Sequence, residues 1–378
     1  MNKTKILLAC PTSIHFVQEY IENVLDDKQF DIYFLTWRLN GDVSFFNKKN
    51  VNVITLLNES DSKIKKILKL PFKLLRLSFC LKSIDILHYH FIDHRFVHIV
   101  EFFIGRNAKK TILSFWGSDL LRQTKRKILS FNSLYKRANK INLMNKEMLD
   151  SFNKTTKSKF LDKLLVLDFG DSTLDSVVKN LKASGKKKAK EMFGVPENKI
   201  TVHLAYNGFR AQQHLKMIES LSVCDESVKD QIFVMVPLSY GCDGDDYKKQ
   251  ISAALKDAGI EYAIYDSYLE KEDVANFRLS ADIFLYGQVT DAVSASMIEY
   301  IAAGCAVVKP KWLVYSELTD VGVVMIEYES FSNLTSVFEY VIKNNVWKTI
   351  NYGKNQSEVF SMKSWSVLKN KWLEMYND

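Results

Sequence analysis

The chain has 378 residues, of which 47% are hydrophobic and 12% aromatic, and its formal net charge at pH 7 is +8. This length suits two domains, and the apolar content excludes an intrinsically disordered chain. The five cysteines are scattered without a Cys-x-x-Cys pair, which indicates reduced cytoplasmic thiols and offers no metal site. No apolar run approaches the roughly 20 residues of a membrane span, and the run before Cys10 is too short for a signal peptide.

The first part of the chain alternates apolar runs with helical patterns. Residues 5–10 and 30–36 predict strands, and residues 14–25 between them predict a helix. This alternation favours an α/β fold with a doubly wound parallel sheet, in which ligands bind at the carboxyl ends of the strands. The turn at residues 11–15, which includes His15, is therefore expected to edge a cleft. A Gly-x-Gly-x-x-Gly fingerprint is missing from this turn, which argues against a nicotinamide or flavin cofactor.

A strongly basic segment follows, beginning with Lys63 and ending with Lys82. Residues 62–82 contain seven basic residues and no acidic one, interleaved with Ile, Leu and Phe at helical spacing. Pro71 is predicted to separate two short helices. The composition fits helices lying on an anionic membrane surface, and it also fits a basic helix packed on its own domain. Since no nucleic-acid-binding module is recognisable, no nucleic acid partner is expected.

Histidines mark the end of the next predicted strand, residues 83–90. His90 ends this strand, with His88 behind it. The following predicted helix carries an i, i+4 histidine pair, His94 and His98. No Glu follows His94, so the metalloprotease pattern is absent. We expect the strand-end histidines to line the cleft without binding a metal.

A second strand-end loop lies within residues 110–121, KTILSFWGSDLL. It predicts a strand, a Trp-Gly turn and a helix capped by Ser118 or Asp119. One alternative is a capped helix over a buried tryptophan with no further role. The basic residues 122–140 extend the positive surface.

A new alternation of strands and helices begins near residue 200. The polar, basic residues 183–190 are the best linker candidate before it. Predicted strands at residues 200–205 and 231–238 end in turns containing Asn207 and Gly208, and Tyr240 and Gly241, respectively. We interpret the Asp-Gly-Asp-Asp run at residues 243–246 as a solvated turn and not as a metal-binding Asp-x-Asp pair.

The stretch ADIFLYGQVTDAVSASMIEYIAAGCAVVKP, residues 281–310, reads as one strand-helix-strand crossover. Ser294 and Ser296 are candidate N-caps, and Gly304 is placed to end the helix in a left-handed conformation. A helix start of small residues suits a phosphate group. The carboxylates of Asp291 and Glu299 suit sugar hydroxyls, so the stretch predicts a pocket for a nucleotide-linked sugar.

The spacing Asp291-x7-Glu299, followed by Ala302-Ala303-Gly304 and a valine strand, resembles the acidic motif of GT-B glycosyltransferases. That family usually has Glu-x7-Glu, in which the first acid contacts the donor sugar and the second contacts the ribose. The resemblance implies two doubly wound Rossmann-like domains that face each other across a cleft. It places them at residues 1–188 and 189–355, with a final helix at 356–378 crossing back to the first.

The same resemblance gives roles to the loop residues. Residues 206–210 look like the glycine-containing loop of the family's carboxyl-terminal domain, with Gly208 approaching the diphosphate and Arg210 as a charge clamp. The loop at Trp116 and Asp119 resembles the amino-terminal His-Gly-x-Asp loop and is expected to face the acceptor or donor. An inverting reaction needs a general base, for which His15, His90 and Asp119 are candidates, whereas a retaining reaction needs none.

Details such as Asn207-Gly208-x-Arg210 and Pro237-Leu-Ser-Tyr-Gly241 are similar to bacterial transferases of surface polysaccharide assembly. Among these is the family that adds N-acetylfucosamine to a lipid-linked intermediate of enterobacterial common antigen. The resemblance implies metal-independent transfer of a hexosyl or acetamidosugar from a nucleotide-diphosphate sugar to a glycan or polyprenyl-diphosphate-linked acceptor, at the cytoplasmic face of the membrane. A GT-B epimerase and an inactive homologue that binds membrane or a partner remain alternatives.

Overall fold

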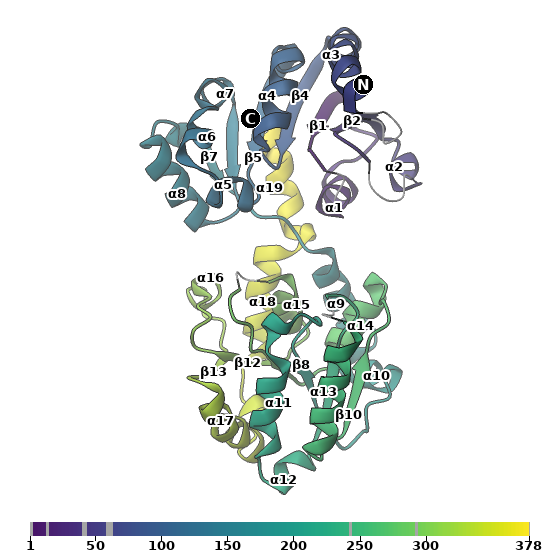
Figure 1. Cartoon of the computed structure of the whole chain (residues 1–378), viewed down its shortest axis with the longest axis vertical. Coiled ribbons are helices and arrows are strands. Elements are labelled where there is room, and N and C mark those ends of the chain that lie inside the picture. Colours follow the sequence, from purple (N-terminus) through teal and green to yellow (C-terminus); the bar gives the residue numbers. More distant parts are fainter. Residues whose placement is uncertain are drawn as a thin grey trace. The chain divides into compact units, whose positions relative to one another are not determined.

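The computed structural model describes residues 3–12, 15–39, 44–57, 63–241, 244–291 and 294–377. The chain divides into two compact units, Met1–Gly170 with Trp365–Asp378, and Asp171–Ser364. Each unit is a parallel β-sheet covered by helices, and Figure 1 follows the chain through them. The division after Gly170 and the return at Trp365 differ from the expected boundaries at residues 188 and 355.

Unit 1 contains a seven-stranded parallel sheet in the order β3-β2-β1-β4-β5-β6-β7. Its strands are β1 Thr4–Ala9, β2 Phe30–Thr36, β3 Asn52–Thr55, β4 Ile84–His90, β5 Ala108–Ser114, β6 Lys140–Leu143 and β7 Leu164–Val166. Leu7 and Leu8 of β1 are both buried, one in each of two separate apolar clusters. Since side chains alternate across a strand, this sheet is covered on both faces, which explains its near-continuous apolar strands.

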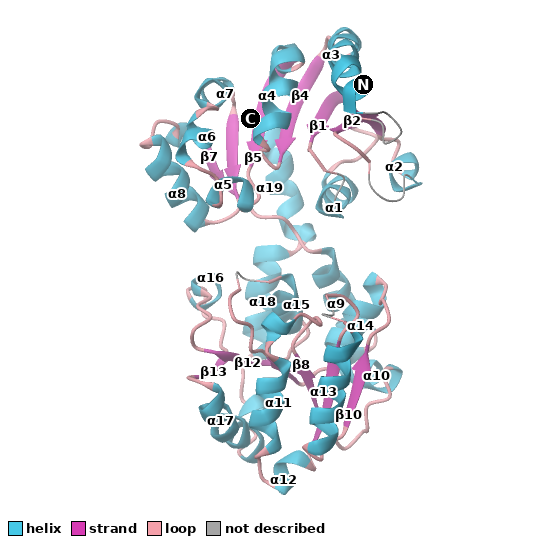
Figure 2. Ribbon diagram, viewed as in Figure 1, coloured by secondary structure: helices cyan, strands magenta, loops and turns pink. Residues whose placement is uncertain are grey.

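Helices from both ends of the chain cover the faces of this sheet (Figure 2). They are α1 His15–Val24, α2 Ser44–Lys48, α3 Lys63–Cys80, α4 His94–Phe103, α5 Ser118–Leu121, α6 Lys125–Leu129, α7 Asn132–Arg137, α8 Lys146–Thr156 and α19 Trp365–Asn377, with short 3₁₀ turns at Gly105–Asn107 and Leu161–Lys163. The last helix, α19 (yellow in Figure 1), packs beside α1 in unit 1. The hydroxyls of Tyr20 and Tyr376 lie 2.5 Å apart at this contact.

The predicted break at Pro71 is wrong, because α3 is one helix with Pro71 inside it. A proline within a helix costs about 3 kcal/mol. One turn further along the helix, Leu74 is fully buried, and Leu70 and Leu77 pack against the same core. Burying a leucine side chain contributes about 1.5–3 kcal/mol, so the apolar face of α3 outweighs the cost of its proline.

Unit 2 contains a six-stranded parallel sheet in the order β10-β9-β8-β11-β12-β13. Its strands are β8 Ile200–Leu204, β9 Ile232–Pro237, β10 Tyr262–Tyr265, β11 Ile283–Leu285, β12 Ala306–Pro310 and β13 Ile326–Tyr328. Its helices are α9 Ser172–Ala183, α10 Gly185–Met192, α11 His214–Ser222, α12 Glu226–Lys229, α13 Asp245–Asp257, α14 Lys271–Leu279, α15 Ala295–Ala302, α16 Ser316–Thr319, α17 Phe331–Lys343 and α18 Tyr352–Lys363, with 3₁₀ turns at Arg210–Gln212 and Val346–Lys348.

The proposed linker at residues 183–190 is wrong, because α10 occupies most of it within unit 2. Two of its lysines bind neighbouring parts of unit 2. Lys186 Nζ donates to the Gly304 carbonyl at 2.9 Å, and Lys190 forms an ion pair with Asp282. Ala189, which lies between these two lysines in the sequence, is buried. Lysines of a run that the sequence suggested was solvated therefore bind partners within the fold.

Of the helices in the described ranges, none is long and apolar enough to cross a membrane.

Candidate functional site

The candidate site of unit 2 lies where the strand order reverses, between β8 and β11. These strands pair in register, with Leu204 opposite Leu285, so the loops after them leave the same edge side by side. Two hydrogen bonds join the loops: Val289 N–H donates to the Ala211 carbonyl at 2.9 Å, and the Gln212 amide donates to Gln288 Oε1 at 2.7 Å. Ligands of doubly wound sheets bind at this reversal point.

Helix α15 starts at this edge as its sequence predicts. The Ser294 side chain accepts a hydrogen bond from the Met297 N–H at 3.2 Å, which is an N-cap, and Gly304 after the helix has φ +68°. Both the cap and the left-handed ending are confirmed. Ser296 is not a cap, because it lies inside the first turn and is buried there.

The Glu299 carboxylate is held by Arg278, a buried residue that was not among the predicted site residues. Arg278 Nε, from the end of α14, donates to Glu299 Oε2 at 2.8 Å, and both side chains are more than nine-tenths buried. The same guanidinium donates to the Tyr300 hydroxyl at 3.0 Å and to Ser296 Oγ at 3.1 Å. Two of the residues predicted for donor binding, Ser296 and Glu299, are thereby fixed by one cation.

The Asp291 carboxylate is surrounded by tyrosine hydroxyls. Tyr286 and Tyr315, both buried, donate to Asp291 Oδ2 at 2.9 Å each. The Tyr286 hydroxyl also lies 2.7 Å from Gln288 Oε1, so its single proton is shared between two acceptors. Burial raises the pKa of Asp291, and hydrogen bonds from Tyr286, Tyr315 and Ser294 oppose that rise.

The glycine-containing loop is tied to its neighbour. Gly208 N–H donates to the Tyr240 carbonyl at 2.9 Å, so this amide serves to join two loops. Asn207 Oδ1 accepts from the Phe209 N–H at 3.1 Å, and the Arg210 guanidinium lies 4.2 Å from the centre of the Tyr247 ring.

Tyr240 connects this loop with α15. Burial raises the pKa of the Tyr240 phenol, while the charge of Arg278 and hydrogen bonds with Asn207 and Ser296 lower it. The next residue, Gly241, has φ +71°, and a Cβ there would lie within 3 Å of the Phe209 ring. Only glycine fits this turn, and the preceding Tyr240 lies close to both Asn207 and Ser296.

A buried histidine follows this loop. His214 is fully buried at the start of α11, and burial lowers its pKa to about 4. Its Nδ1 lies 3.2 Å from the Tyr247 hydroxyl, and its Nε2 finds no hydrogen-bond partner among the described residues.

In unit 1, His90 ends β4 at the corresponding edge of the sheet and lies inside an aromatic cluster. Its ring centre is 4.7 Å from Tyr20 and 5.9 Å from Trp116. Burial lowers the pKa of His90 to about 3, and neither ring nitrogen has a hydrogen-bond partner within the described ranges. His88 behind it lies 2.8 Å from both the Tyr376 hydroxyl and Ser114 Oγ.

Asp119 binds backbone and does not cap a helix. Gly117 occupies the N-cap position of α5, so the predicted cap by Ser118 or Asp119 is wrong. Asp119 accepts from the N–H groups of Ile92 at 2.7 Å, Trp116 at 2.8 Å and Gly117 at 2.9 Å. Its carboxylate therefore joins the loops after β4 and β5, and burial raises its pKa.

Two parts of the expected site fall outside the described residues. The first part comprises Ser13 and the His15 side chain, and the second is Asp243 of the acidic run. Asp245 and Asp246 are exposed in the first turn of α13. Across the described ranges, no group of three or more His, Cys, Asp or Glu side chains is arranged to hold a metal ion.

In sequence, the chain matches no family model and no curated protein. In structure, it is similar to a glycosyltransferase from Rickettsia africae, with a TM-score of 0.73 and 16% identity over 100% of this chain and 98% of that one. The chain has the GT-B fold. HepE from Anabaena, solved with UDP and glucose, gives a TM-score of 0.63 at 11% identity over 99% of both chains.

A further GT-B neighbour is WaaG, a glycosyltransferase involved in lipopolysaccharide biosynthesis. It gives a TM-score of 0.59 at 13% identity over 99% of both chains. These full-length matches confirm the fold class predicted from the strand-helix alternation.

Proposed function

We propose that this protein is a glycosyltransferase that moves a sugar from a nucleotide-diphosphate donor to a glycan or lipid-linked glycan acceptor in bacterial surface polysaccharide synthesis. The observation that carries the proposal is the meeting of Asp291, Ser294 and Glu299 with the Asn207–Tyr240 loops at the reversal point of the unit 2 sheet. Neighbours of the same fold bind UDP and UDP-glucose, which supports a nucleotide-sugar donor.

Each group has a proposed role in donor binding. The capped start of α15 faces the diphosphate with its first-turn N–H groups, assisted by Arg210, and stabilises the charge that develops on the leaving group. Glu299, held by Arg278, accepts from the ribose hydroxyls. Asp291 orients the donor sugar, and Tyr240 and Gly241 border the nucleotide.

The acceptor side is proposed to lie at the strand ends of unit 1, near His90 and Asp119. Neither is arranged as a strong general base, since the pKa of His90 is lowered to about 3 and both oxygens of Asp119 accept backbone hydrogen bonds. His15 is the remaining candidate if the reaction inverts. A hexosyl or acetamidosugar donor and a reaction that needs no metal remain part of the proposal.

The first test is binding of UDP, dTDP, GDP and CMP by thermal shift, with and without EDTA. One nucleotide is expected to raise the melting temperature by several degrees, to the same extent with EDTA, and Glu299→Gln is expected to reduce this shift. Lys311→Gln, a change at an exposed ion pair with Glu329, serves as the matched control. If none of the four nucleotides raises the melting temperature, the proposed transferase function is rejected.

An inactive GT-B homologue is the second candidate. The observation that favours it is that both carboxylates already have partners within the protein: Asp291 accepts from two tyrosines, and Glu299 pairs with Arg278. It predicts nucleotide binding without turnover. Hydrolysis or transfer of the sugar from the stabilising nucleotide-sugar, measured by release of the nucleoside diphosphate, would reject it. Interconversion of the donor sugar without transfer would instead indicate an epimerase.

We also propose that α3 places the protein on the cytoplasmic face of an anionic membrane. The described part of this helix exposes Phe72, Leu75 and Phe79, which are 77%, 50% and 60% exposed, next to the exposed cation Arg76. Apolar side chains flanked by basic ones suit the boundary between headgroups and acyl chains. Sedimentation with phosphatidylglycerol-containing vesicles, weakened in a Phe72→Ser/Phe79→Ser variant, is the expected result. Equal sedimentation of both proteins would reject this surface.

A further inference from the structure

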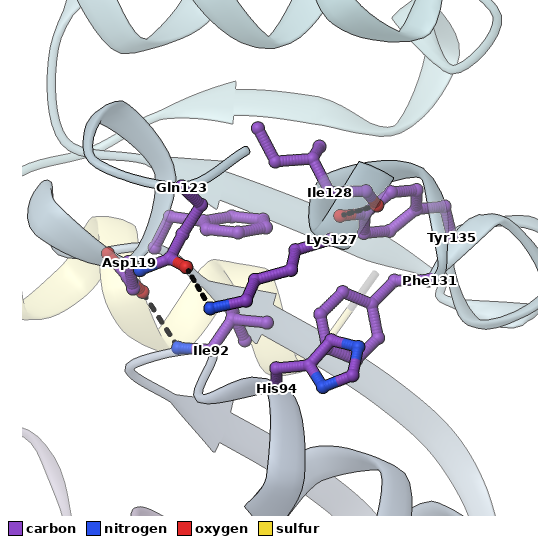
Figure 3. Close-up of a pocket in the computed structure, with 9 residues that line it drawn as sticks. Ile92, His94, Asp119, Gln123, Lys127, Ile128, Phe131 and Tyr135 are labelled. Atoms are coloured by element: carbon purple, nitrogen blue, oxygen red, sulfur yellow. Dashed lines mark hydrogen bonds between the residues drawn. The ribbon is translucent and has the colours of Figure 1, made fainter. Parts of the chain in front are cut away.

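Lys309 is a charged residue in the interior of the unit 2 sheet. Lysine side chains are almost never fully buried unless they are paired. Lys127 of unit 1 follows the rule: it is exposed at the edge of a small hollow and extends toward Gln123, with its Nζ 3.4 Å from Oε1 (Figure 3). Lys309, in the otherwise apolar strand β12, is only 1% exposed. Burial of an ammonium group is costly unless partners compensate for the lost water.

The Lys309 ammonium has three neighbours. It forms a 2.6 Å ion pair with Glu327 of β13, the residue beside Lys309 in the register of the sheet. It donates to the Leu313 carbonyl at 2.8 Å and lies 5.5 Å from the centre of the Tyr315 ring. Because Leu313 and Tyr315 belong to the loop after β12, residues 311–315, this one cation fixes the loop to the ends of two strands.

The loop after β12 also reaches the loop that carries Asp291. Trp312 Nε1 donates to the Gln288 carbonyl at 3.0 Å, and the Tyr315 hydroxyl donates to Asp291 Oδ2 at 2.9 Å. In sequence, the carbonyl that Lys309 binds lies between these two contacts. Lys309 therefore holds the segment from which Tyr315 meets Asp291.

The charge at position 309 contributes little to the packing of the sheet. Apolar residues of similar volume often replace a buried ion pair without loss of stability. The Glu327 side chain is 43% exposed, so its carboxylate stays hydrated when the ammonium is removed. An apolar side chain at position 309 lacks only the donor for the Leu313 carbonyl and the cation beside Tyr315.

We infer that Lys309 is a positioning residue, which keeps Tyr315 at the place where its hydroxyl donates to Asp291. The Tyr315 hydroxyl has a single proton to donate, and a hydrogen bond weakens when its partners move apart or out of line. This inference rests on the proposed function in one respect, since Asp291 is the carboxylate proposed to orient the donor sugar. Lys309 thereby affects the affinity for the sugar without contacting it.

The experiment is calorimetric titration of the full-length protein with UDP-glucose, dTDP-glucose and GDP-glucose, and with the three matching nucleoside diphosphates. Lys309→Met is expected to lower the affinity for the nucleotide-sugar about two- to tenfold, as for the loss of one hydrogen bond, and to leave the affinity for the diphosphate unchanged. In a Tyr315→Phe background, Lys309→Met is expected to have no further effect. Unchanged affinity, additive losses, or an equal loss for both ligands would overturn the inference.

Two further variants control for the charge and for folding. Lys311→Gln removes a nearby lysine whose ion pair with Glu329 is exposed, and it is expected to leave both affinities unchanged. Glu327→Gln removes the carboxylate that holds Lys309 from a partly exposed position, so it is expected to fold even if Lys309→Met does not. Its nucleotide-sugar affinity is expected to fall in the same direction, and thermal melting checks that each variant is folded.

Failure of the proposed function has a different result. Urea unfolding without ligand measures whether Lys309→Met and Tyr315→Phe affect stability independently or together. Coupled effects in a protein that binds none of the six ligands would retain Lys309 as the residue that positions Tyr315, and would remove only its role in donor binding. Independent effects on stability would overturn the inference itself.

Discussion

Arg278 Nε donates a hydrogen bond to Glu299 Oε2 at 2.8 Å, and both side chains are buried in unit 2. The residue expected to contact the ribose is therefore also the counter-ion of a buried cation. Glu299 therefore contributes both to stability and to the proposed ribose contact. To separate these contributions, a substitution of Glu299 must preserve its hydrogen bond with Arg278.

Glu299→Ala is expected to destabilise the protein by about 3–5 kcal/mol, because it leaves the Arg278 charge buried without its counter-ion. Glu299→Gln keeps an oxygen acceptor at the same position and is expected to cost less. Urea unfolding of unit 2, followed by fluorescence, measures both. Equal stability of the alanine variant and wild type would show that the pair is not buried in solution.

The tyrosines around Asp291 are expected to determine how it meets the donor sugar. Tyr286→Phe and Tyr315→Phe each remove one hydroxyl near Asp291 Oδ2 while keeping the buried ring. A hydrogen bond of this kind contributes about 0.5–1.5 kcal/mol. The affinity for the nucleotide-sugar is therefore expected to fall about two- to tenfold, with affinity for the nucleoside diphosphate unchanged. An equal loss for both ligands would instead indicate a general disturbance of the pocket.

Acid is expected to destabilise both units through buried histidines. Burial lowers the pKa of His90 to about 3 and of His214 to about 4, against 6.5 for an exposed histidine. Below pH 6.5 the unfolded chain binds protons that the folded chain does not, so the free energy of unfolding falls as the pH drops from 6.5 toward 4. At pH 5 each histidine accounts for about 2 kcal/mol.

Thermal melting between pH 7 and pH 5 measures this effect. His90→Phe replaces a ring that has no hydrogen-bond partner among the described residues, so the pH dependence of this variant is expected to be shallower than that of wild type. A melting temperature that is the same at pH 7 and pH 5 would contradict the prediction.

Asp119 is expected to contribute to stability more than to chemistry. Asp119→Ala leaves the N–H groups of Ile92, Trp116 and Gly117 without their acceptor, at an expected cost of about 3–5 kcal/mol. Asp119→Asn keeps one acceptor oxygen and is expected to fall between alanine and wild type. Full stability combined with lost transfer in Asp119→Asn would instead support a role as general base.

Sequence reasoning succeeded where the cause is local. Alternating apolar runs and helical patterns predicted the parallel α/β fold. Ser294 and Gly304 marked the two ends of α15, since a cap and a left-handed ending depend on a few neighbouring residues. The same local reasoning failed at Pro71, where packing of Leu74 outweighs an intrinsic preference.

By itself, the sequence determined the α/β class, the order of most strands and helices, and the segment from Asp291 to Glu299 as the candidate site. The tertiary structure alone decided the partners of these carboxylates. Arg278 reaches Glu299 from another helix, and His88 meets Tyr376 from 288 residues away. Secondary structure follows from periodicity within about ten residues, whereas a buried polar group takes its partner from whichever segment the folded core brings beside it.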